Sequence, residues 1–236
     1  MRKVLGTCLI ATAVAGVAFA APASGAGPTL ANWQMNEGSG ATTMVDSSGN
    51  GINGSIGSAV KTGVVFQGAT GYQWAFTSPT NPPAQPQRII QANSASLNPN
   101  SGNYSVTLRY RTTKHFGNII QKGQAGAKGG YFKIENPNGQ LNCVFRGTNS
   151  SGAFQRKAVQ APTTQSDGNW HTATCTRTAT GVTLTIDGTV VGTAKGSSGN
   201  ITNPNPITIG GKLNCDQVHT TCDYFTGGID YITISN

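Results

Sequence analysis

The strongest constraint in this sequence is an alternation of apolar and polar residues with a period of two. In the segment 105–111, Val106, Leu108 and Tyr110 alternate with hydroxyl-bearing and basic residues. An extended strand points successive side chains to opposite faces, so this pattern predicts a strand with one face in a core and one in solvent. We find no long amphipathic helix. Similar short runs recur at Tyr131–Glu135, Leu141–Arg146, His171–Thr178, Val182–Ile186, Ile207–Ile209 and Ile229–Ile234.

Turn-forming residues separate these runs. Asn138-Gly139 and Asp187-Gly188 each lie between two predicted strands, and both dipeptides readily adopt the positive φ angles of a tight hairpin turn. The chain of 236 residues contains 32 glycines and 11 prolines, and a chain of this length can enclose one sizeable core. Many short strands joined by frequent turns predict a single all-β domain, a sandwich or a barrel.

The amino terminus has the features of an export signal. Arg2 and Lys3 precede an uncharged stretch that runs to Ala20, and small residues offer cleavage sites after Ala20 or Ala26. A membrane anchor is the less favoured alternative, because the stretch is short and no basic flank follows it. We therefore expect residues 1–26 to be removed, residues 27–236 to form the domain, and the product to be secreted into the extracellular space without membrane insertion.

The cysteines fit an oxidising compartment. Cys8 belongs to the predicted signal, which leaves four of the five cysteines in the mature chain. Cys143 and Cys175 each lie inside a predicted strand, so they can face each other across neighbouring strands or across two sheets. Cys215 and Cys222 flank a short polar loop, and we pair them as a loop staple. Zinc binding is disfavoured because the sequence contains no C-x₂-C motif.

Several segments of the chain carry short motifs in a fixed order: Trp33–Gly40, Val45–Gly54, Asp167–Thr172, Leu184–Gly188 and Phe225–Ile232. In this order they resemble motifs of LamG-like jelly-roll domains in the concanavalin A-like lectin/glucanase superfamily. The similarity extends over about residues 29 to 236. It implies a jelly-roll β-sandwich of two antiparallel sheets, in agreement with the period-two pattern.

The acidic residues argue against a typical glycan hydrolase. Glucanases of the resembled superfamily carry closely spaced acids on one strand, and retaining hydrolysis needs two carboxyl groups about 5 Å apart. The eight acids of this chain include no two within five residues of each other, and no G-x-S-x-G motif is present. We interpret His171 as a strand residue rather than a catalytic base. We therefore expect no catalytic residues, with a secreted hydrolase as the least favoured alternative.

The resemblance also implies a structural calcium ion. Asp46 lies in a loop rich in oxygen ligands and glycines, Val45–Gly51, and Asp230 lies on the closing strand. These are the two positions at which the resemblance places calcium ligands. An ordinary Asx turn explains the Asp46 segment equally well.

Aromatic side chains are the first candidates for a ligand-binding surface. Sugar rings present apolar faces that stack on Trp and Tyr, so we ask which rings are exposed. Trp33 and Trp170 match positions that the resemblance places in the core. Tyr72 and Trp74 share one strand face by parity, and they form either a stacking platform or the cover of a core edge.

Basic residues are the second candidates. Arg109 and Arg111 share the polar face of one predicted strand and form a shallow positive stripe there. Loss of Arg2 and Lys3 lowers the formal net charge from +8 to +6. No basic block is longer than Arg156-Lys157, so we expect no nucleic-acid partner. The stripe serves either solubility or attraction to acidic polysaccharides.

These observations predict a secreted, monomeric binding module whose partner is a polysaccharide or cell-surface glycan. The alternative is an extracellular adhesion or structural protein that binds a protein partner.

Overall fold

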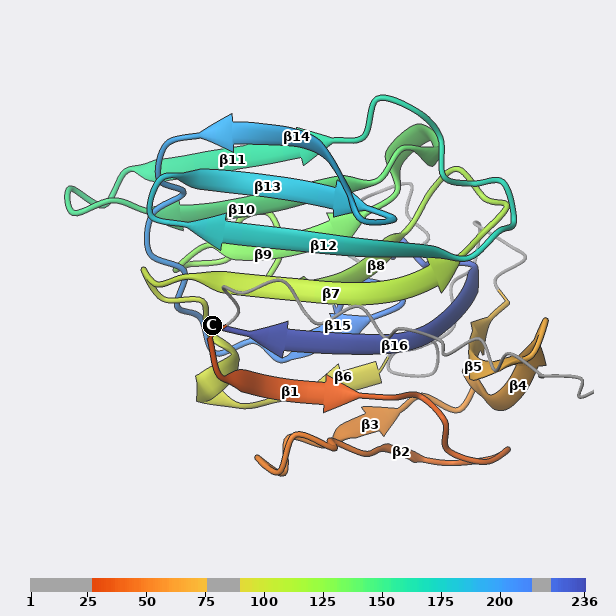
Figure 1. The fold of residues 1–236 in the computed structure, drawn as a ribbon. Helices are drawn as coiled ribbons and strands as arrows, with labels where there is room; N and C mark the ends of the chain where they lie inside the picture. The colour runs from red at the N-terminus through yellow and green to blue at the C-terminus, as the bar shows by residue number, and fades with distance from the viewer. Residues whose placement is uncertain (1–26, 76–89, 214–221) are drawn as a thin grey trace, which may run out of the picture.

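The computed structural model describes residues 27–75, 90–213 and 222–236, which form two antiparallel sheets packed face to face (Figure 1). This arrangement confirms the predicted all-β sandwich of jelly-roll type. The predicted signal peptide (1–26), the proline-rich loop (78–86) and Cys215 lie outside the described residues. In the part of the chain that the structure describes, no helix is long and apolar enough to cross a membrane.

Each sheet contains eight strands. The spatial order in sheet A is β14 (Thr189–Lys195), β13 (Gly181–Ile186), β12 (His171–Thr178), β7 (Tyr104–Arg111), β16 (Gly227–Ser235), β5 (Ala69–Trp74) and β4 (Lys61–Phe66), with β1 (Thr29–Trp33) paired to β16. The order in sheet B is β11 (Phe154–Gln160), β10 (Asn142–Thr148), β9 (Tyr131–Glu135), β8 (Asn118–Lys122), β15 (Ile207–Ile209), β6 (Ile90–Ala92), β3 (Gly54–Ile56) and β2 (Thr43–Met44). Two single turns of 3₁₀ helix, η1 (Ala95–Leu97) and η2 (Pro137–Gly139), complete the described elements.

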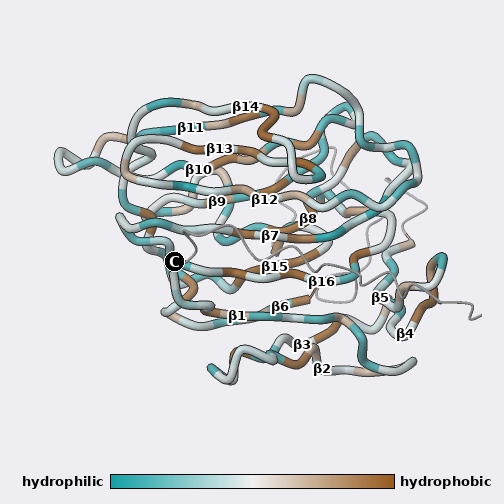
Figure 2. The backbone as a smooth tube through the Cα atoms, viewed as in Figure 1, coloured by the Kyte–Doolittle hydropathy of each residue, from teal (hydrophilic) through white to brown (hydrophobic). Residues whose placement is uncertain are grey.

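The alternation along the strands divides core from surface as predicted. On β7, Val106, Leu108 and Tyr110 are fully buried between the sheets, whereas the residues between them are partly exposed. Figure 2 shows apolar residues recurring along the strands of both sheets. Every strand predicted from a period-two run is present. Both predicted hairpin turns are also confirmed, because all four of their residues have positive φ angles.

A disulfide joins the two sheets. Cys143 lies on β10 of sheet B and Cys175 on β12 of sheet A, with both residues fully buried and their Cα atoms 5.8 Å apart. Of the two arrangements that the sequence allowed, the structure therefore shows the inter-sheet bridge. Cys222 is also disulfide-bonded; its predicted partner, Cys215, lies outside the described residues.

A buried arginine fixes the loops at the end of the sandwich where β7 begins. Arg177, on β12, is 2% exposed and donates hydrogen bonds to the carbonyl oxygens of Pro99 (3.0 Å), Asn100 (2.9 Å), Gly199 (3.3 Å) and Gly102. Burial lowers the pKa of this guanidinium to about 10, which leaves it charged at neutral pH. The side chain therefore ties two separate loop segments to sheet A.

Replacing both bridged cysteines, Cys143→Ala with Cys175→Ala, should destabilise the fold without changing its topology. The bridge closes a long loop in the unfolded chain, so its loss should lower the free energy of unfolding by about 3–4 kcal/mol. Urea denaturation of the oxidised protein and of the double variant measures the difference. A loss below about 1 kcal/mol would show that the sheets do not depend on the covalent bridge.

Candidate functional site

The two predicted arginines lie on the outer face of sheet A, where they contact a tryptophan. Arg109 and Arg111 alternate with the buried residues of β7 and therefore point away from the core. The guanidinium carbon of Arg109 lies 4.9 Å from the ring centroid of Trp170, and that of Arg111 lies 5.8 Å from it. Cations at these distances are attracted by the π-electrons of the indole.

Phe66, the last residue of β4, completes the group. Its ring centroid lies 5.6 Å from that of Trp170 with the planes at 85°, and the guanidinium carbon of Arg111 lies 5.5 Å from it. Gly228 makes room for this contact, because a Cβ atom there would lie 3.1 Å from the phenyl ring. We refer to Phe66, Arg109, Arg111 and Trp170 as the arginine–aromatic cluster.

The two arginines of the cluster differ in charge pairing. Arg109 Nη1 lies 2.6 Å from Asp230 Oδ2, so its charge is neutralised within the fold. Among the described residues, no carboxylate lies within ion-pair distance of Arg111. The guanidinium of Arg111 is therefore the one in the cluster that can bind an external anion. Its planar set of N–H donors suits a carboxylate or sulfate group.

A row of hydroxyl groups continues from the cluster along β7. Thr107 and Thr174 hydrogen-bond to each other at 3.0 Å, as do Ser105 and Thr176, each pair bridging β7 and β12 on the outer face. From Ser105 to Arg111 this strand extends about 20 Å. The outer face of β7 therefore presents hydroxyl groups at one end and a cation with aromatic rings at the other.

The predicted aromatic pair has a different environment. Tyr72 and Trp74 do share one face of β5, but that face is the core: they are 0% and 3% exposed. The Tyr72 hydroxyl donates a hydrogen bond to the Glu37 carboxylate, and the Trp74 ring packs edge-on against Phe225 with centroids 6.1 Å apart. Of the two interpretations that parity allowed, the structure shows the core one, and these rings present no stacking platform.

Trp33 and Trp170 were both expected in the core, and only one of them lies there. Trp33 is fully buried, with its indole N–H donating to the carbonyl oxygen of Ile52 at 2.7 Å. Trp170 is partly exposed and lies against the arginines, so its assignment to the core is wrong. The strand β7, which carries the two outward-pointing arginines, becomes the neighbour of β12 only in the folded sheet, so the sequence alone did not place Trp170 outside.

The two predicted calcium ligands do not fit a shared metal site. The Asp46 carboxylate accepts hydrogen bonds from the backbone N–H groups of Asn32, Ser48 and Ile52 (each 2.9 Å) and from the Ser48 hydroxyl (2.8 Å). These donors direct positive hydrogens at the oxygens that a cation would need. Asp230 is paired with Arg109. In the described ranges, no group of three or more His, Cys, Asp or Glu side chains could hold a metal ion.

Hydrogen bonding controls the ionisation of Asp46. Burial opposes the charged form, but the backbone donors of Asn32, Ser48 and Ile52 and the Ser48 hydroxyl outweigh it, so the pKa of Asp46 is lowered. The carboxylate thus organises the loop as an Asx turn, which was the alternative interpretation of this segment.

His171 lies between two carboxylates. Its Nδ1 is 2.7 Å from Asp187 Oδ2 and its Nε2 is 3.1 Å from Asp167 Oδ1. Burial opposes protonation, but hydrogen bonds to Asp187 and Asp167 outweigh it and raise the pKa of the imidazole. Hydrogen bonds from the backbone and side chain of Asn169 are the main reason that the pKa of Asp167 is about 2. Both ring nitrogens are occupied, so the histidine links the loop before β12 to the β13–β14 turn.

Comparisons with known proteins agree with the fold. A family model described as the Concanavalin A-like lectin/glucanases superfamily matches residues 84–236. The binding domain of botulinum neurotoxin DC, solved in complex with SialylT, is 15% identical with a TM-score of 0.59, covering 88% of this chain and 47% of that chain. The binding domain of botulinum neurotoxin serotype G is also 15% identical, with a TM-score of 0.55, covering 88% of this chain and 46% of that chain.

Domains LG4-5 of the mouse laminin alpha1 chain are 20% identical with a TM-score of 0.44, covering 62% of this chain and 37% of that chain. The chain thus spans less than half the length of each of these three solved structures. No curated protein matches it. At these identities the toxin structures show a shared fold.

The contacts of Asp46 lead to a prediction about calcium. Because its carboxylate is filled by N–H and O–H donors, the melting temperature should be the same in excess calcium and in excess chelator. Asp46→Ala should lower the free energy of unfolding by about 1–3 kcal/mol, since it leaves buried backbone donors without acceptors. Differential scanning calorimetry measures both effects. A calcium-dependent rise in the melting temperature that Asp46→Ala abolishes would contradict this prediction and support a calcium site at Asp46.

The environment of His171 leads to a prediction about pH. Because the pKa of His171 is raised in the folded state, the protonated imidazole stabilises the fold. This stabilisation is fully present below the pKa of histidine in the unfolded chain, about 6.5, and is lost as the pH rises through the pKa of the folded state. His171→Gln should therefore cost more stability at about pH 5.5 than at about pH 9, by about 0.5–1 kcal/mol for such a partly exposed group. Urea denaturation at both pH values tests this. The control is His115→Gln, because His115 is exposed. An equal loss of stability in His171→Gln at both pH values would contradict the account.

Proposed function

Because the chain belongs to the Concanavalin A-like lectin/glucanases superfamily, we propose that it is a secreted, non-catalytic module that binds acidic polysaccharides through the arginine–aromatic cluster. The observation that carries this proposal is the position of Arg111. Its guanidinium lies against the rings of Phe66 and Trp170, and no carboxylate among the described residues pairs with it.

The cluster combines the two chemistries that an acidic sugar requires. Indole and phenyl rings cover the apolar face of a pyranose, and a guanidinium forms charge-assisted hydrogen bonds with a carboxylate or sulfate group. The hydroxyl pairs Thr107–Thr174 and Ser105–Thr176 extend the same surface along β7, where they can exchange hydrogen bonds with further sugar hydroxyls. A linear anionic polysaccharide is the ligand that matches these hydroxyl, cationic and aromatic groups in their order along β7.

The same contacts support binding rather than hydrolysis. Within the described residues, Asp230 is the only carboxylate that makes an ion pair or hydrogen bond with the cluster, and Arg109 neutralises it at 2.6 Å. Glycoside hydrolysis in its usual form requires two carboxyl groups, one to donate a proton and one to act as nucleophile or base. The cluster does not supply this pair.

Polygalacturonate is a suitable probe, because its methyl ester has the same sugar backbone without the charge. The oxidised protein should bind the acid form, and its affinity should fall as the salt concentration rises. Arg111→Ala should weaken binding about tenfold or more, since a charge-assisted hydrogen bond is lost, and Trp170→Ala should weaken it similarly. Biolayer interferometry at low and high salt measures the dissociation constants.

The exposed Arg156 on β11 provides the matched control, because Arg156→Ala removes the same charge from the other sheet. If Arg111→Ala and Arg156→Ala lower the affinity equally, net charge alone explains the binding and a specific site is contradicted. Binding of the acid and the ester with equal affinity would also contradict the proposal. Binding to a protein partner that no polysaccharide competes would favour the adhesion alternative.

A further inference from the structure

Regularly spaced hydroxyl groups cover the middle of the outer face of sheet A. Four strands that lie side by side, β13, β12, β7 and β16, each carry two threonines or serines two residues apart (Figure 1). The pairing registers align these residues in two rows, and no bulge interrupts the pairing within the rows. We refer to the eight residues as the threonine array: Thr185, Thr174, Thr107 and Thr233 in the first row, and Thr183, Thr176, Ser105 and Ser235 in the second.

The core holds the array in place. The residues that alternate with its members along the four strands are buried, so parity directs the hydroxyl side chains outward. Cys175, which lies between Thr174 and Thr176, is bridged to Cys143 of sheet B. The disulfide therefore fixes one of the two central strands of the array. Seven of the eight members are partly exposed, and Ser235 is 8% exposed.

Hydrogen bonds between side chains fix the positions of the hydroxyl groups. The two pairs that bridge β7 and β12 have oxygen–oxygen distances of 3.0 Å. Toward the edges of the array, Thr183 bonds to Thr193 (3.1 Å) and Thr233 donates to the Asn32 side chain (3.0 Å). In a hydroxyl pair only one group donates, so the proton of the other and the remaining lone pairs stay available to water. The array is preformed and still able to bind.

The outer face of sheet B carries no such array among the described residues. There, parity places Lys133, Glu135, Val144 and Arg146 on the outer side of β9 and β10, because the residues between them belong to the core. The preference of threonine for strands would favour it on both outer faces. This preference alone therefore does not explain why the hydroxyl groups are concentrated on sheet A.

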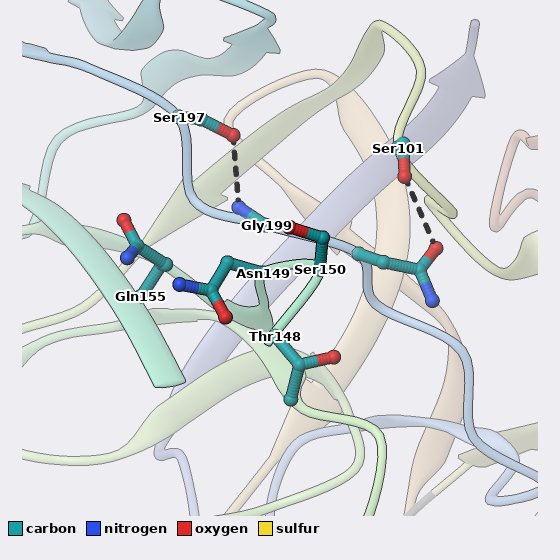
Figure 3. A pocket seen from close by; sticks show the side chains of 8 residues that line it. Ser101, Thr148, Asn149, Ser150, Gln155, Ser197 and Gly199 are labelled. Atoms are coloured by element: carbon teal, nitrogen blue, oxygen red, sulfur yellow. Dashed lines mark hydrogen bonds between the residues drawn. The ribbon is translucent and has the colours of Figure 1, made fainter. Parts of the chain in front are cut away.

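Hydroxyl groups also line a hollow of about 520 Å³ at the end of the sandwich where β7 begins, but they have no repeat there (Figure 3). The lining comes from the loop before β7, the β10–β11 hairpin and the segment before β15. The Ser197 hydroxyl accepts from the backbone N–H of Gly199 (3.1 Å), and the Ser101 hydroxyl bonds to the Asn200 side chain (3.4 Å). Such irregular groups bind single waters, whereas a periodic array can order a layer of them.

The geometry of the array is similar to that of water in ice. Neighbouring strands are about 4.8 Å apart, and residues two apart along a strand are about 6.7 Å apart. Water oxygens on the faces of hexagonal ice repeat at similar distances in two directions. The two central hydroxyl pairs also have the oxygen separation of a hydrogen bond, as neighbouring waters in ice do. None of the eight side chains carries a charge, which would orient water in a shell that does not fit the lattice.

We propose that the threonine array is an ice-binding surface. Its hydroxyl groups anchor waters at lattice positions, and the threonine methyl groups confine the waters between them. The protein then adsorbs to the crystal and blocks the growth of the covered face. Because neighbouring strands of a sheet are rotated by about 20–25°, the match extends over a few strands only. The expected activity is therefore slower recrystallisation of ice rather than a large depression of the freezing point.

The array and the polysaccharide site share the hydroxyl groups of β7 and β12 but differ in the rest of their residues. The members on β13 and β16 lie outside the polysaccharide site, and the arginine–aromatic cluster lies outside the array. The ice-binding proposal does not depend on the acidic-sugar proposal. Variants on β13 and in the cluster can therefore separate the two activities.

Partition into a slowly growing ice crystal tests the proposal. The oxidised protein is mixed with serum albumin as a protein that ice excludes, and the amounts of both are measured in the ice and in the remaining liquid. The protein should be enriched in the ice relative to albumin. It should also slow the coarsening of ice grains in a frozen sucrose solution.

Lysine variants on β13 assign the contact. Thr185→Lys and Thr183→Lys each place a long charged side chain in the array. Each should lower the enrichment in ice about tenfold, because the charge would lose its hydration at the crystal surface without gaining a partner. Thr163→Lys adds the same charge at an exposed loop position and should keep the enrichment. Urea denaturation verifies that all three variants are folded.

The outcomes separate this surface from the polysaccharide site. Arg111→Ala should keep the enrichment in ice while it loses polygalacturonate binding. The ice-binding surface is refuted if the protein enters ice no more than albumin does, if both folded β13 variants keep the enrichment, or if Thr163→Lys loses it equally. Polygalacturonate binding through Arg111 would stand in each of these cases. Loss of the enrichment in Arg111→Ala would assign ice binding to the cluster and also refute the array.

Discussion

Each sheet of the sandwich divides the side chains of its strands between the core and the outer surface, and β7 shows how this division determines where charge can lie. Its apolar residues fill the space between the sheets, so the alternate positions must point outward. This parity places Arg109 and Arg111 on the same surface, two residues apart. Trp170 and Phe66 lie over them, since the rings shield apolar area and the guanidinium groups gain a cation–π contact. The candidate site is therefore a direct consequence of the period that builds the core.

Most charged groups that look functional in the sequence are used to hold the fold together. Asp46 accepts backbone hydrogen bonds that order its loop, and His171 joins two loops through a pair of carboxylates. Arg177 satisfies loop carbonyl oxygens from inside the sandwich. Each of these groups has its hydrogen-bonding capacity filled by the chain itself, which removes it from ligand or metal chemistry. Arg111 differs from them because its partners among the described residues are aromatic rings, which leave its donors available.

Sequence reasoning found strands in which apolar and polar residues alternate along the chain. β8 illustrates the limit: all five of its residues are buried, so its sequence carries no period and the strand was not predicted. Parity also states which residues share a face but not which face is the core, and this is why Tyr72 and Trp74 were left open. Trp170 was misplaced for a related reason. Whether a tryptophan near a strand end lies inside or outside depends on what covers it, and the arginines that do so come from another part of the chain.

The most direct test of the acidic-sugar site uses the indole N–H signals of the three tryptophans. Trp33 and Trp74 are core residues, whereas Trp170 lies in the arginine–aromatic cluster. Titration of the labelled, oxidised protein with galacturonate oligomers should shift the Trp170 indole signal progressively and leave the other two in place. If the Trp170 signal does not move while the oligomer binds, the ligand occupies another surface and the central claim is contradicted.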